Sequence, residues 1–75
     1  MGHSIRKEKW EDIEHNLERS TELLGDLQEL IEELIEDYSY SNYAGERREK
    51  LAEMHADIEQ ALKTLESTSA KLHDY

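Results

Sequence analysis

Apolar side chains recur through the first half of the chain at alternating steps of three and four residues. They are Trp10, Ile13, Leu17, Leu24, Leu27, Ile31, Leu34 and Tyr38, with Ser20 as the one polar member of the series. This spacing directs one stripe of a long α-helix at a partner helix. A second series follows a break near residues 39–44 and comprises Leu51, His55, Ile58, Leu62, Leu65, Ser69 and Leu72. We therefore expect two long helices that pack on each other.

The segment between the two series favours a turn. Ser39-Tyr40-Ser41-Asn42 is rich in residues that compete with helix, and Asn42 or Ser41 is a candidate N-cap of the second helix. We expect a first helix over about 4–38, a turn at 39–42 and a second helix over about 43–73, all in one domain of 1–75. The regular arms 10–38 and 45–73 have equal length, and the connection between them is short. The fold class is therefore predicted to be all-α, an antiparallel helical hairpin.

A break in the first helix is the main alternative. Ser20-Thr21 followed by Gly25 could end one helix and cap another, which would give three helices. The apolar series keeps its phase from Leu17 through Ser20 to Leu24, and a real break would disturb that phase. This favours a continuous helix in which Ser20 lies near Leu62.

The apolar stripe widens in the middle of the first helix. Leu23, Leu30 and Ile35 flank the inward residues there, and a single partner helix covers only a narrow row. A second hairpin would cover the extra width, which predicts a homodimer that forms a four-helix bundle. The alternative is a monomer in which these side chains stay half exposed. The residues expected to mediate self-association are Leu23, Leu24, Leu27, Leu30, Ile31, Leu34 and Ile35.

The net charge of −10 is concentrated on the first helix. Residues 10–37 contain eleven acids and the single base Arg19, whereas residues 1–9 have a net charge of +2 and residues 38–75 of −2. Such a surface disfavours direct binding to nucleic acid phosphates or to an anionic membrane. The expected partner is another protein with a basic or helical surface.

The sequence contains no residue set that indicates catalysis, a metal site or a bound cofactor. There is no cysteine, and the serines and threonines lack a base at a readable spacing. Glu32-Glu33 and Glu36 invite comparison with the metal-binding helix of all-helical nucleotide pyrophosphohydrolases. Glu53 and Asp57, however, are separated by three residues where that family has two. We therefore expect that the chain is not an enzyme.

Histidines and tyrosines give two further expectations. His15 is expected on the outer face, whereas the spacing of His55 puts it in the inward row of the second helix, where it could make association depend on pH. Aromatic and basic residues near the turn are candidates for partner binding, together with the acids that precede them. These candidates are Tyr38, Tyr40, Tyr43, Arg47, Arg48, Glu29, Glu32, Glu33, Glu36 and Asp37.

These observations predict a noncatalytic protein–protein interaction module that self-associates and acts as an adaptor, a small chaperone or a regulatory subunit. The alternative is an acidic inhibitor of the phage type, which mimics nucleic acid and blocks a basic groove. The negative charges of residues 10–37 are spaced about 4 Å apart along the helix axis, near the 3.4 Å per charge of one DNA strand. The absence of cysteine and of an apolar run long enough to span a membrane fits a cytoplasmic location.

Overall fold

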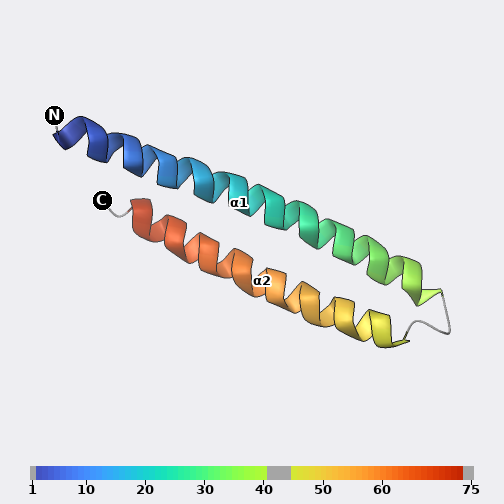
Figure 1. The fold of residues 1–75 in the computed structure, drawn as a ribbon. Helices are drawn as coiled ribbons and strands as arrows, with labels where there is room; N and C mark the ends of the chain where they lie inside the picture. The colour runs from blue at the N-terminus through green and yellow to red at the C-terminus, as the bar shows by residue number, and fades with distance from the viewer. Residues whose placement is uncertain (1, 41–44, 74–75) are drawn as a thin grey trace.

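Two antiparallel helices make up the described part of the chain (Figure 1). The computed structural model describes residues 2–40 and 45–73, with side chains from residue 6 onward. Helix α1 is Gly2–Ser39 and helix α2 is Gly45–His73. The two chain ends lie at the same end of the molecule, opposite the connection between the helices (Figure 1). The all-α helical hairpin expected from the sequence is confirmed.

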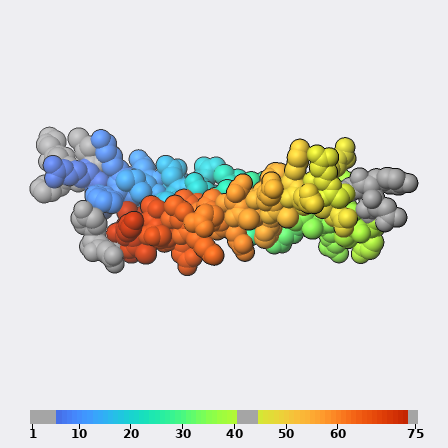
Figure 2. All heavy atoms as spheres, turned by 90° about the horizontal axis from the view of Figure 1, so that it is seen from below, coloured from blue at the N-terminus to red at the C-terminus, as the bar shows by residue number. Residues whose placement is uncertain are grey.

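The hairpin is a thin rod, as the space-filling view shows (Figure 2). Its principal dimensions are 63 × 16 × 13 Å. At 1.5 Å per residue a helix of 38 residues is about 57 Å long, so α1 accounts for most of the length of the rod. Two helices side by side define its width, and no third layer covers them in the part of the chain that the structure describes.

Helix α1 runs through the Ser20–Gly25 segment without a break, as expected. The Thr21 hydroxyl donates a hydrogen bond of 2.8 Å to the carbonyl oxygen of Leu17, one turn earlier. This bond satisfies the hydroxyl locally and is compatible with a continuous helix. Helix α2 begins at Gly45, and its expected caps Ser41 and Asn42 lie outside the described residues.

The interior of the hairpin is small. Ile31, 3% exposed, is the one hydrophobic residue among those described that is fully buried. The inward row of α2 is half-buried along its whole length, as the spacing predicted. It comprises Leu51, His55, Ile58, Leu62, Leu65, Ser69 and Leu72.

The inward row of α1 differs from the expected one. Four residues of the series were expected to face α2 but are exposed: Trp10 (43%), Ile13 (46%), Leu27 (39%) and Leu34 (43%). Gln28 and Ile35 are half-buried in their place, so α1 is rotated about its own axis relative to the expectation. The apolar stripe of α1 is wider than one helix can cover, and α2 packs against one side of that stripe.

The same rotation moves Ser20 away from its expected place near Leu62. Ser20 is exposed and lines a groove together with Ala61 and Leu65 of α2. Thr21, the next residue along the chain, lines a groove together with Leu62.

Candidate functional site

One side of the hairpin presents a continuous stripe of exposed apolar side chains. Leu23, Leu27, Leu30 and Leu34 follow one another at steps of four, three and four residues, which places them on one side of α1. Leu23 is 63% exposed and Leu30 is 58% exposed. These four leucines belong to the predicted self-association set. The other three members, Leu24, Ile31 and Ile35, pack inside the hairpin.

The stripe continues toward the start of α1 and is joined by one residue of α2. Trp10 is 43% exposed, Ile13 is 46% exposed and Met54 is 47% exposed. Ile13 precedes Leu27 by fourteen residues, two heptads, so both lie on the same side of the helix. We use the term apolar face for Trp10, Ile13, Leu23, Leu27, Leu30, Leu34 and Met54.

The contribution of α2 to this face follows from its own spacing. Met54, Ala61 and Thr68 are seven residues apart. Ala61 lines a groove with Leu23, and Thr68 lines a groove with Trp10 and Ile13. Met54 therefore lies on the side of α2 that borders the exposed leucines. Trp10, Ile13 and Met54 were not in the predicted set, although the heptad spacing of Ile13 to Leu27 and of Met54 to Ala61 could have identified two of them.

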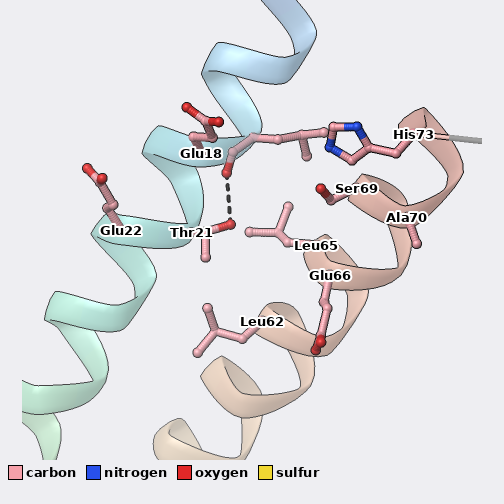
Figure 3. A pocket seen from close by; sticks show the side chains of 10 residues that line it. Glu18, Thr21, Glu22, Leu62, Leu65, Glu66, Ser69, Ala70 and His73 are labelled. Atoms are coloured by element: carbon pink, nitrogen blue, oxygen red, sulfur yellow. Dashed lines mark hydrogen bonds between the residues drawn. The ribbon is translucent and has the colours of Figure 1, made fainter.

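The opposite side of the hairpin has a groove with an apolar floor and a polar border. Figure 3 shows a groove of about 650 Å³ in which Leu62 and Leu65 of α2 point toward Thr21 of α1. Glu18 and Glu22 extend from α1 away from α2 (Figure 3). Glu66, Ser69 and His73 supply the polar border of the groove on α2. None of the large exposed hydrophobic side chains of the described residues lines this groove, so they gather on the other side of the hairpin.

The surface area is large for a chain of this mass. The accessible surface is 6487 Å², whereas a compact monomer of 8.9 kDa is expected to expose about 4,800 Å². The excess of about 1,700 Å² exceeds the roughly 800 Å² that each partner contributes to a standard protein–protein interface. The elongated hairpin therefore exposes more surface than a compact chain of its mass, by more than one partner's share of a standard interface.

His55 forms a polar side-chain contact between the two helices. Its Nε2 atom lies 2.9 Å from Oε1 of Glu32. The side chain of His55 is 24% exposed and that of Glu32 is 56% exposed. The position of His55 in the inward row is confirmed, and its contact joins α1 to α2. His15 is exposed, as expected.

The aromatic and basic residues near the turn are partly used within the hairpin. The guanidinium carbon of Arg47 lies 5.9 Å from the centre of the Tyr38 ring, and Arg47 Nη1 donates a hydrogen bond of 3.4 Å to the Tyr38 hydroxyl. This contact joins the end of α1 to the start of α2. Tyr40 is 85% exposed, Arg48 is half-buried, and Tyr43 lies outside the described residues.

All eleven acids of residues 10–37 are exposed. Within this set Glu29, Glu33, Glu36 and Asp37 are candidate partner-binding residues, and Glu32 is the one that contacts His55. Residues 2–40 and 45–73 contain no group of three or more His, Cys, Asp or Glu side chains arranged to hold a metal ion. Neither helix, over the residues described, is both long and apolar enough to cross a membrane.

Comparison with known proteins gives no assignment. No family model matches the sequence, and neither a curated protein nor a solved structure is significantly similar to it. The features of this molecule that indicate function are therefore the two sides of the hairpin.

Proposed function

We propose that this chain is a noncatalytic protein–protein interaction module that self-associates through its apolar face. The observation that carries the proposal is the row of exposed leucines beside a complete helix–helix contact. Leu23 and Leu30 are more than half exposed, although α2 already covers Leu24 and Ile31. Burial of a leucine side chain is worth about 1.5–3 kcal/mol, so four leucines, Met54 and their copies in a second chain can stabilise a dimer.

An adaptor, a small chaperone or a regulatory subunit would use such a module in the same way. The opposite side remains in water, while the apolar face binds helices. The predicted homodimer is the simplest assembly because a twofold axis lets one face bind an identical face.

The experiment is sedimentation equilibrium of the wild-type chain and two variants. Leu30→Glu puts a carboxylate in the centre of the apolar face. Ala56→Glu adds the same charge at an exposed position of α2 that does not belong to this face. We expect a dimer for the wild type and for Ala56→Glu. For Leu30→Glu the dissociation constant should rise at least about 100-fold. A monomeric wild type that binds no hydrophobic dye would contradict the proposal.

A second candidate function is that of an acidic inhibitor that occupies a nucleic-acid-binding groove. The exposure of all eleven acids on one unbroken helix favours it, because their axial spacing resembles that of phosphates in one DNA strand. Binding to a basic DNA-binding protein should then compete with DNA and be lost between about 50 and 300 mM salt. Binding that is insensitive to salt would exclude this function.

A further inference from the structure

On the basis of the proposed self-association, we propose the orientation of the dimer. The second hairpin lies on the apolar face with its turn at the same end, so that α1 packs antiparallel against α2 of the second copy. Two twofold arrangements can bring identical faces together. An axis along the rod keeps both turns at one end, and an axis across the rod puts them at opposite ends. In the second arrangement α1 packs against the α1 of the other copy.

The axis along the rod preserves the axial register of the hairpin. Two residues are called level when they lie at the same height along the rod. Residues of α1 and α2 that are level within one chain are therefore also level when they belong to different copies. Contacts in the hairpin fix this register: Glu32 meets His55, and Tyr38 meets Arg47. A groove near the middle of the rod is lined by Leu24 together with Ala61.

In this register the apolar residues on the border of one copy meet apolar residues of the other. Leu30 is level with Met54, and Leu23 is level with the small residue Ala61. The next pair toward the chain ends, Asn16 and Thr68, is polar on both sides. Apolar residues therefore meet apolar residues and polar residues meet polar residues, as a well-packed helix–helix interface requires.

The arrangement with turns at opposite ends matches the apolar face less completely. If the two α1 helices are superimposed in opposite directions about their midpoints, Leu30 is level with Glu11 and Leu34 with Lys7 of the second copy, so leucines cover charged side chains. If the axis is shifted so that Leu27 is level with Leu30, the leucines meet, but Trp10 and Ile13 extend beyond the end of the second α1 and gain no apolar partner there.

The distribution of charge also favours the arrangement with both turns at the same end. Residues 10–37 of α1 have a net charge of −10, whereas α2 has six acids and five bases, a net charge of −1. Contact between α1 and the α2 of a second copy avoids the direct apposition of two strongly acidic helices. An apposition of like charges is unfavourable across an interface.

Individual charged residues at the border of the apolar face also form pairs of opposite charge between the two copies. Lys50 and Lys71 lie on the outer side of Met54 and Thr68, and Lys71 lines the groove with Trp10 and Ile13. In the preserved register Lys50 is level with Glu33, and Lys71 is level with Asp12. All four side chains are exposed in the single hairpin. One pair along this border, Asp26 with Asp57, is unfavourable.

Pulsed electron paramagnetic resonance tests the orientation directly. The chain contains no cysteine, so Tyr40→Cys provides a single labelling site at the turn end. With turns at the same end the two labels of a dimer should be about 15–35 Å apart, because neighbouring helix axes are 8–10 Å apart. With turns at opposite ends the separation should be about 40–60 Å, at 1.5 Å per residue along the rod.

Glu22→Cys is the matched control. Glu22 is exposed, lies on the side away from the apolar face and is close to the middle of α1, so the distance between its labels should be nearly the same in either arrangement. A measurable distance for Glu22→Cys together with a Tyr40→Cys distance of about 40–60 Å would overturn the orientation and leave self-association intact. The absence of any intermolecular distance for both variants would instead contradict the proposed function.

Charge exchange provides an independent test. Glu33→Lys puts two lysines at each Glu33–Lys50 contact of the dimer and should weaken association about tenfold. Lys50→Glu should do the same. An equimolar mixture of the two variants restores opposite charges between chains and should form heterodimers about as tightly as the wild type. Mixing cannot relieve any repulsion within a chain, so recovery isolates the contact between copies.

Glu29→Lys is the control for the change in net charge. It removes the same negative charge from the outer side of α1 and should not weaken the dimer, because self-repulsion decreases. If Glu33→Lys associates as tightly as Glu29→Lys and the mixture shows no preference for heterodimers, the proposed orientation is wrong.

Discussion

At the scale of single residues, Ile31 has the largest role in the packing of the hairpin. Its side chain is 3% exposed, and every other hydrophobic residue among those described is at least partly accessible. Loss of a buried isoleucine removes apolar contacts and leaves a cavity that the surroundings fill only in part. A hairpin with so small an interior has few other contacts that can compensate.

We therefore predict that Ile31→Ala lowers the free energy of unfolding by about 2–4 kcal/mol. Urea unfolding monitored by circular dichroism measures the change. Glu29→Ala is the control, because Glu29 is an exposed residue of the same helix and its replacement should change stability by less than about 0.5 kcal/mol. Equal unfolding midpoints for the two variants would show that Ile31 is not the centre of the packing.

Individual residues also show where sequence reasoning reached its limit. The inward row of α2 was predicted correctly because its apolar residues form one narrow stripe. The inward row of α1 was predicted with the wrong rotation because its apolar residues cover a wider arc. Hydrophobic spacing cannot decide which edge of a wide arc faces α2. It also gave no reason to expect that Gln28, a polar residue, would be half-buried.

At the scale of the helices, α1 is long and has one intrinsically weak position. Gly25 lies in the middle of the helix, and no described glycine has a positive φ angle. A Cβ atom at Gly25 would meet nothing within 4 Å. Glycine in a helix interior costs about 0.5–1 kcal/mol relative to alanine, because the unfolded chain has more conformational freedom.

Gly25→Ala should accordingly stabilise the protein by about 0.5–1 kcal/mol and raise its melting temperature by a few degrees. Gly45→Ala is the matched comparison, since Gly45 also has free space around it but is the first residue of α2. Glycine is better tolerated than alanine at a helix N-terminus, so the gain there should be absent or smaller. A lower melting temperature for Gly25→Ala, measured by circular dichroism, would indicate that α1 needs flexibility at this point.

The continuity of α1 could be predicted because the phase of the apolar series persisted through Ser20, Thr21 and Gly25. The start of α2 was less certain, since Tyr43 and Gly45 were both plausible first residues. The structure begins α2 at Gly45. Local composition identifies a turn, but the first residue of a helix depends on capping geometry, which composition does not specify.

At the scale of the whole molecule, two properties of the rod have opposite effects on self-association. The apolar face favours association, and the net charge of −10 opposes it through repulsion between copies. The sequence predicted both properties but not which edge of α1 stays open, because that depends on how α1 is rotated against α2. The strength of association is therefore expected to depend on how well salt screens the repulsion.

We predict that self-association strengthens several-fold when sodium chloride is raised from about 20 to about 500 mM, because the Debye length falls well below the width of the rod. Sedimentation equilibrium at several salt concentrations measures the change. Apolar burial is not weakened by added salt, whereas binding of the acidic surface to a basic groove would be. The sign of the salt dependence therefore separates the two candidate functions. Weaker self-association at high salt would show that ion pairs such as Glu33–Lys50, and not the exposed leucines, hold the two copies together.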